Sequence, residues 1–177
     1  MLENARQLAI KLHGSQLRKS NGLSYFDSHL AECESIAACH GANLVIRKAC
    51  YLHDSLEDQE ATNEVELEEL GVLDAVKQLT ENKQLRWEER KQEVIHHIPS
   101  ISYDAAFTKA CDVLSNLRGL LRDGSGYPQI WDAFKRGREK SLWFYEGCVI
   151  NLSQRGDLPV GLIAELRMTF DYVNNHI

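Results

Sequence analysis

Four ionisable side chains crowd the end of an apolar helical pattern in the segment YLHDSLEDQE. His53 and Glu57 are four residues apart, and so are Asp54 and Asp58, so each pair is predicted to share one face of a helix. Burying such groups together costs free energy unless a partner offsets their charge. A metal ion is the partner that these residue types favour.

Two further residues provide candidate ligands from other parts of the chain. His29 is expected to open a helix after a loop, and Asp112 lies in TKACDVLSNLR, within an otherwise apolar helix interior. An unpaired aspartate there is costly, which makes a cation an attractive partner. Together with His53 and Asp54 they form a set of two imidazoles and two carboxylates. This set suits Mn²⁺, Fe²⁺, Zn²⁺, Co²⁺ or Ni²⁺ and has too few oxygen atoms for Ca²⁺.

A site of this kind predicts hydrolytic chemistry. Its open positions would hold water and a substrate oxygen, and a water whose pKa is lowered by a metal is a nucleophile at neutral pH. Glu57 and Asp58 then remain to orient that water and to move protons.

Each candidate also has an ordinary structural role when it is taken alone. His29 could cap a helix, Asp112 could pair with Lys109 or Arg118, and EDQE could be a solvated helix end. The joint pattern of H, then HD, then D on three separate helices favours the metal site.

Helical spacing of apolar residues extends over most of the chain, and no stretch alternates as a strand does. Gly41 is expected to end one helix, Gly71 to break another and Ser102 to cap a third. The predicted fold is all-α, a single domain of packed helices over residues 1–177. The expected helices span about 2–13, 29–40, 43–58, 64–79, 87–98, 103–122, 129–152 and 159–175.

Composition narrows the class of protein. The 177 residues are 44% hydrophobic, which is enough for one full core, and the net charge of −6 argues against a general nucleic-acid binder. The five cysteines form no CxxC pair, so we expect reduced core thiols and neither a disulfide framework nor a thiolate zinc site. The apolar runs are too short for a membrane span or a signal peptide, so we expect a cytoplasmic protein without a membrane partner.

The H…HD…D pattern resembles that of the HD-domain metal-dependent phosphohydrolases. The segments HGSQLRKSNGLSYFDSHL, YLHDSLED, LTENKQLRWEERK and KACDVLSNLRGL are similar to successive motifs of the RelA/SpoT-type hydrolase domain and of the small alarmone hydrolases. The resemblance covers about residues 5–150. It implies an HD-domain fold and removal of the 3′-pyrophosphate from (p)ppGpp, a small-molecule nucleotide substrate.

By position, the resemblance also implies roles for individual residues. The metal, usually Mn²⁺ in that family, would be held by His29, His53, Asp54 and Asp112. Catalytic roles fall to Glu57 and Asp58. Contacts to the nucleotide and its phosphates fall to Arg18, Lys19, Lys83, Arg90, Lys91 and Asn116. Lysines and arginines on helix faces are often only solvated, and this alternative applies above all to Lys83.

Several positions depart from the family pattern, which reads roughly KLADKLxNLR around the last ligand. Val113 stands where the family has a lysine, and Ala110 and Cys111 replace Leu-Ala. The family's PYxxHP becomes SYFDSHL, without the prolines. The expected hydrolytic chemistry is thus better supported than the substrate. The alternatives are an HD-type nucleotidase acting on a simpler nucleoside phosphate, and a nucleotide sensor without activity, for which retained Glu57 and Asp58 would have no use.

Overall fold

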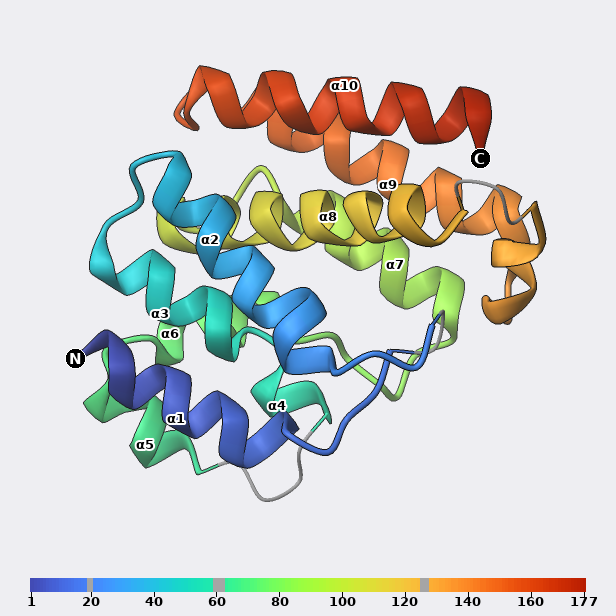
Figure 1. Cartoon of the computed structure of the whole chain (residues 1–177). Coiled ribbons are helices and arrows are strands. Elements are labelled where there is room, and N and C mark those ends of the chain that lie inside the picture. Colours follow the sequence, from blue (N-terminus) through green and yellow to red (C-terminus); the bar gives the residue numbers. More distant parts are fainter. Residues whose placement is uncertain (19–20, 59–62, 125–127) are drawn as a thin grey trace.

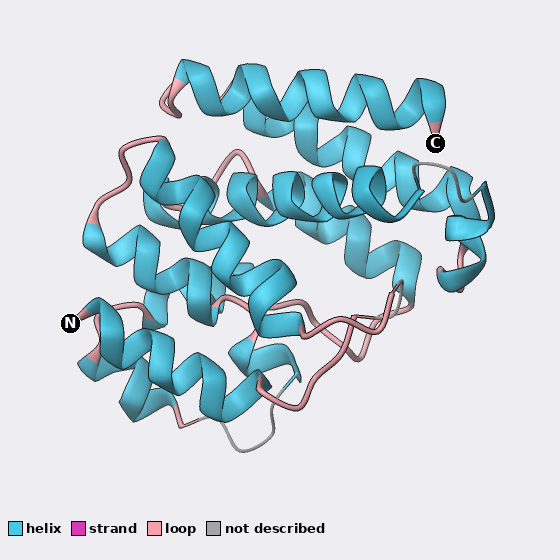
Figure 2. Ribbon diagram, viewed as in Figure 1, coloured by secondary structure: helices cyan, strands magenta, loops and turns pink. Residues whose placement is uncertain are grey.

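The computed structural model describes residues 1–18, 21–58, 63–124 and 128–177, and every regular element in these ranges is a helix (Figure 2). One isolated bridge joins Leu17 and Ser24 across a loop. The elements in chain order are α1 Leu2–His13, the π-helix η1 Phe26–Leu30, α2 Ala31–Cys39, α3 Leu44–Leu52, α4 Ser55–Asp58, α5 Glu64–Glu69, α6 Leu73–Leu79, α7 Trp87–His97, α8 Tyr103–Gly124, the 3₁₀-helix η2 Pro128–Ala133, α9 Gly137–Gln154 and α10 Val160–His176. The predicted all-α fold is confirmed.

Helix α8 is the centre of the molecule. It packs against α2 and α3 on one side and against α9 and α10 on another, with α1 and α5 farther out (Figure 1). Because it is covered from several directions, nearly every residue from Ala105 to Ser115 is buried, and Phe107, Leu114 and Leu117 are at most 1% exposed. Asp112 is therefore placed deep among helices.

Local sequence signals set several helix ends, and those at Gly41, Gly71 and Ser102 were predicted. Asn43 caps α3 by accepting a hydrogen bond from the Ile46 N–H at 3.0 Å, and Ser102 accepts one from the Ala105 N–H at 3.2 Å. Gly41 and Gly71 have φ angles of 76° and 70°, which turn the chain after α2 and between α5 and α6. Among the described helices, none is long and apolar enough to cross a membrane.

The predicted continuous helix over residues 43–58 is wrong. It is interrupted at His53 and Asp54, between α3 and α4. The Ser55 hydroxyl donates to the Leu52 carbonyl at 2.7 Å, and His53 Nδ1 donates to the Cys50 carbonyl at 3.0 Å. These side chains bond to carbonyls that a continuing helix would use for its own backbone.

Two other helix boundaries also differ from the prediction. His29 does not open a helix but lies inside η1, which runs into α2, because Ser24 caps the chain earlier by accepting from the Asp27 N–H at 3.2 Å. The helix expected over 129–152 is divided into η2 and α9, since Gly137 turns the chain between them with a φ of 71°.

Candidate metal centre and substrate cavity

The fold brings the four predicted metal ligands together from η1, the α3–α4 turn and α8. His29 Nε2 lies 3.4 Å from Asp112 Oδ1, and His53 Nε2 lies 3.7 Å from the same oxygen. His53 Nε2 is also 3.3 Å from Asp54 Oδ2. Bonds of about 2.0–2.2 Å at tetrahedral angles separate ligand atoms by about 3.4 Å. The three measured separations are within a few tenths of an ångström of this value, so these side chains are close enough to be considered as ligands of one metal ion.

Hydrogen bonds on the far side of each imidazole turn its Nε2 atom toward this cluster. His29 Nδ1 donates to Ser115 Oγ at 3.0 Å, and that hydroxyl donates in turn to Glu32 at 2.8 Å. His53 Nδ1 is used by the Cys50 carbonyl. Orientation of a ligand histidine by such an outer partner is typical of metal sites.

The charges in the cluster require compensation. Burial alone would raise the pKa of Asp112, but the Lys109 ammonium at 2.8 Å and the two histidines hold that pKa well below its usual range. Burial would lower the pKa of His53, but Asp54 and Asp112 outweigh it and raise that pKa well above 6.5. Two carboxylates thus stay ionised inside the protein and attract positive charge.

One buried atom supports a metal directly. His53 is 3% exposed, and its Nε2 makes no hydrogen bond to any described residue. Its charged neighbours are Asp54 Oδ2 at 3.3 Å and Asp112 Oδ1 at 3.7 Å. A metal held between these atoms would bind Nε2, and the two nitrogen and two oxygen donors fit a divalent transition metal.

Glu57 lies beside the cluster on α4, where its environment prepares it to exchange a proton. Burial, followed by the negative charges of Asp54 and Glu81, raises the pKa of Glu57 to about 7. Its Oε1 accepts a hydrogen bond from the Glu81 backbone N–H at 2.7 Å, which fixes the carboxyl group. A carboxyl with a pKa near neutrality is suited to general acid–base work. The side chain of Asp58 lies outside the described part of the structure.

A cavity of about 280 Å³ opens beside the four ligands. Its polar walls include Tyr25, Asp54, Glu57, Lys91, Asp112 and Asn116. Its aromatic walls are Trp87, Phe134, Phe144 and Tyr145. Tyr25 donates its hydroxyl hydrogen to Asp54. The cavity therefore combines a metal cluster, a cation and flat ring surfaces, which suits a phosphorylated molecule with an aromatic base.

Arg18 and Asn116 lie next to each other at this site although the sequence separates them widely. Arg18 Nη2 donates to Asn116 Oδ1 at 3.0 Å, and Asn116 Nδ2 donates to Asp112 Oδ1 at 2.7 Å. Arg18 Nη1 is buried and has no hydrogen-bond partner among the described residues. The guanidinium packs over Gly119, where an added Cβ would lie 3.1 Å from Nη2.

The remaining predicted basic residues are placed differently. Lys91 lines the metal cavity, where its ammonium lies 4.3 Å from the centre of the Phe144 ring and pairs with Glu81. Lys83 is exposed and donates to the backbone carbonyl of Glu57. Lys19 lies outside the described residues.

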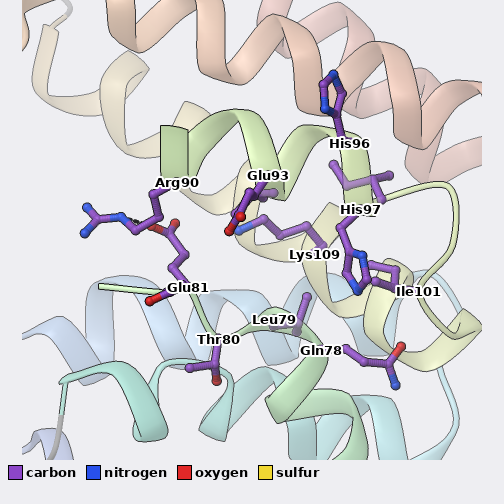
Figure 3. Close-up of a pocket in the computed structure, with 13 residues that line it drawn as sticks. Gln78, Leu79, Thr80, Glu81, Arg90, Glu93, His96, His97, Ile101 and Lys109 are labelled. Carbon is purple, nitrogen blue, oxygen red and sulfur yellow. Dashed lines mark ion pairs between the residues drawn. The ribbon is translucent and has the colours of Figure 1, made fainter. Parts of the chain in front are cut away.

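Arg90 faces a second cavity, of about 430 Å³, behind the segment 78–82. Figure 3 shows Arg90 and Glu81 paired on one side of this cavity and His97 on the other. Arg90 Nε lies 2.6 Å from Glu81 Oε2. Glu81 and Lys109 line both cavities and so form part of the wall between them.

Several residues at the site were not among the predicted ones. Tyr25 and Ser115 contact the predicted ligands, and Cys33 places its sulfur 3.8 Å from His29 Nδ1. Lys109 does pair with Asp112, at 2.8 Å, as the alternative role considered for Asp112 expects. The sequence could have indicated two of them, because Tyr25 and Cys33 are each four residues from His29 and would share its face of a helix. The aromatic walls come from distant segments and carried no such signal.

Comparison with known proteins shows which ones this chain is similar to. No family model matches the sequence. The MESH1 protein of Xenopus tropicalis, named guanosine-3′,5′-bis(diphosphate) 3′-pyrophosphohydrolase, is 31% identical over 126 residues, covering 69% of this chain and 70% of that protein. The Danio rerio protein of the same name is 30% identical over 148 residues, covering 81% and 79%.

Solved structures show the same fold. A metazoan ortholog of SpoT, described as hydrolysing ppGpp, superimposes with a TM-score of 0.80 at 24% identity and covers 96% of this chain and 93% of that one. The protein lmo0812 of Listeria monocytogenes EGD-e gives a TM-score of 0.71 at 26% identity, covering 82% and 94%. The HD-domain fold expected from the sequence is thereby confirmed.

Proposed function

This chain belongs to the family of MESH1-type guanosine-3′,5′-bis(diphosphate) 3′-pyrophosphohydrolases, which are hydrolytic enzymes, and we propose that it removes the 3′-pyrophosphate from ppGpp. Water adds across the bond between the ribose 3′ oxygen and the pyrophosphate, which leaves a guanosine 5′-diphosphate and free pyrophosphate. The observation that supports this most is the cluster of His29, His53, Asp54 and Asp112 beside a cavity with cationic and aromatic walls.

We infer that these four residues hold one divalent ion and that Mn²⁺ is that ion. Two imidazoles with two carboxylates suit Mn²⁺, and His53 Nε2 offers a buried nitrogen without a hydrogen bond to any described residue. A bound divalent ion supplies polarisation of a phosphoryl oxygen and lowers the pKa of water. All five cysteines are free thiols, which is typical of a reducing compartment, and we therefore propose that the protein acts in the cytoplasm.

In our proposal Glu57 accepts the proton of the attacking water, because its pKa of about 7 allows both states near neutral pH. Asp58 follows Glu57 on α4, and we assign it to the same proton transfer on the resemblance. Lys91 is within the cavity and offsets negative charge that grows on the phosphates in the transition state.

We assign the nucleoside to the pair formed by Arg18 and Asn116. Arg18 has a buried Nη1 without a hydrogen bond to the described residues, and a guanidinium can stack on a base or bind phosphate. A nucleoside monophosphate would not need this group, which favours ppGpp over the nucleotidase alternative. Lys19 is assigned with Arg18. Lys83 donates to the backbone carbonyl of Glu57 and Arg90 pairs with Glu81, and we assign both an indirect role through these two residues.

This proposal is tested by measuring the products released from ppGpp, pppGpp, NADPH and nucleoside monophosphates in the presence of Mn²⁺. Glu57→Gln should keep the fold and lose about 100- to 10,000-fold in turnover of ppGpp, since the amide cannot accept a proton. Glu69→Gln is the matched control, because Glu69 is exposed on α5 and should leave turnover unchanged. Faster hydrolysis of a monophosphate, or full activity of Glu57→Gln, would refute the assignment.

A further inference from the structure

A thiol lies against the two histidines of the candidate metal centre. Cys33 follows His29 by one helical turn and is fully buried. Its Sγ lies 3.8 Å from His29 Nδ1 and 4.0 Å from His29 Nε2. Ligand atoms of His29, Cys33 and His53 all lie within 4.8 Å of one another. Three potential metal-binding atoms are thus gathered here from η1, α2 and the α3–α4 turn.

Both imidazoles direct one nitrogen into this group. Ser115 and the Cys50 carbonyl engage the Nδ1 atoms, which leaves each Nε2 for a ligand. His53 Nε2 is buried and lacks a hydrogen-bond partner in the described part of the chain. Apart from its contacts with the His29 ring, Cys33 Sγ makes a long hydrogen bond of 3.7 Å to the Cys111 carbonyl. Only weak hydrogen bonds of Cys33 have to be broken before its sulfur can turn toward a cation.

The separation between Cys33 and His29 fits a sulfur-containing site after a small adjustment. Zinc–sulfur bonds of about 2.3 Å and zinc–nitrogen bonds of about 2.0–2.1 Å at a tetrahedral angle separate sulfur from nitrogen by about 3.6 Å. The observed 4.0 Å between Cys33 Sγ and His29 Nε2 needs a shift of a few tenths of an ångström. A thiolate from Cys33 would add the sulfur donor that a soft ion prefers.

We propose that Cys33, His29 and His53 give the metal centre a second binding mode, which takes a thiophilic divalent ion such as Zn²⁺ and thereby excludes the catalytic ion. The Cys33 thiol proton is released to solvent when the ion binds. Cys33 is then a residue that determines metal selectivity, and Zn²⁺ inhibits hydrolysis by competing with Mn²⁺. Only this inhibitory consequence rests on the proposed function.

Co²⁺ is a spectroscopic probe of the sulfur ligand. Titration of the metal-free protein with Co²⁺ should produce the near-ultraviolet charge-transfer band of a thiolate bound to cobalt. Cys33→Ala and Cys33→Ser should both lose this band, with circular dichroism confirming the fold. Cys148→Ala is the matched control, because Cys148 is another fully buried thiol outside the group and should leave the band intact. No band in the unmodified protein, or a band that survives in both Cys33 variants, overturns the proposal.

Affinity measurements test selectivity separately from catalysis. Competition with a chelating dye should show that Cys33→Ala weakens Zn²⁺ binding by at least about tenfold, the lower end of what loss of a supporting residue costs. Mn²⁺ binding should change far less, and Zn²⁺ should inhibit Mn²⁺-dependent hydrolysis more strongly in the unmodified protein than in Cys33→Ala. Equal loss of both affinities overturns selectivity by Cys33. Failure to hydrolyse ppGpp with Mn²⁺ would refute the proposed function and leave the Co²⁺ and Zn²⁺ results standing.

Discussion

The raised pKa of Glu57 makes the stability of the metal-free protein depend on pH. An isolated glutamate has a pKa of 4.5, and burial together with Asp54 and Glu81 raises that of Glu57 to about 7. Between these values the unfolded chain has lost the proton while the folded protein still holds it, so the free energy of unfolding falls as pH rises from 4.5 to 7. One pKa unit is about 1.4 kcal/mol. The fall attributable to Glu57 is therefore at most about 3 kcal/mol.

Glu57→Gln isolates this contribution from that of other titrating groups. The glutamine oxygen can still accept the Glu81 N–H bond, but the side chain no longer ionises. Urea unfolding of both proteins, freed of metal by a chelator, should be measured at pH 4.5 and pH 8. The variant should gain stability relative to the unmodified protein over this interval by up to about 3 kcal/mol. Differences that stay within about 0.5 kcal/mol at both pH values would refute the reasoning about Glu57.

Three further substitutions test other parts of the site. Asp112→Asn should abolish binding of the one Mn²⁺ per chain that elemental analysis is expected to find; full binding would remove Asp112 from the ligand set. Ser115→Ala should weaken Mn²⁺ binding by about 10- to 100-fold in calorimetry, because His29 loses the oxygen that orients its ring; an unchanged dissociation constant would contradict this role. Arg18→Ala should raise KM for ppGpp more than it lowers kcat in steady-state assays, and Gly119→Ala should do so more weakly by displacing the guanidinium; an unchanged KM in both variants would favour a simpler substrate.

Helical periodicity predicted the fold class and most helix positions, because burial against α8 repeats with the spacing of a helix. It did not predict the interruption at His53 and Asp54. Periodicity describes which residues are apolar, whereas the interruption depends on His53 and Ser55 bonding to the carbonyls of the preceding turn.

The sequence predicted those site residues whose burial without a partner would cost free energy. Asp112 was named because a carboxylate is expensive in an apolar helix, and His29 because it was expected at the start of a helix after a loop; the two do lie together. The contact between Arg18 and Asn116 joins residues 98 positions apart, and its geometry arises only when the Arg18 segment packs on α8. The inward position of Cys33 was not distinguishable from that of the other buried thiols, since sequence does not show which apolar face meets the metal cluster.

Glu81, in the wall between the two cavities, connects residues of both cavities to Glu57. Glu81 holds Arg90 and Lys91 with its carboxylate, while its backbone N–H holds the carboxyl of Glu57. The segment 78–82 also borders the larger cavity, which contains no predicted metal ligand. A displacement of this segment would carry the Glu81 N–H with it and so would act on the carboxyl of Glu57 through this hydrogen bond. The position of Glu57 beside the metal cluster therefore depends on the segment that separates it from the larger cavity.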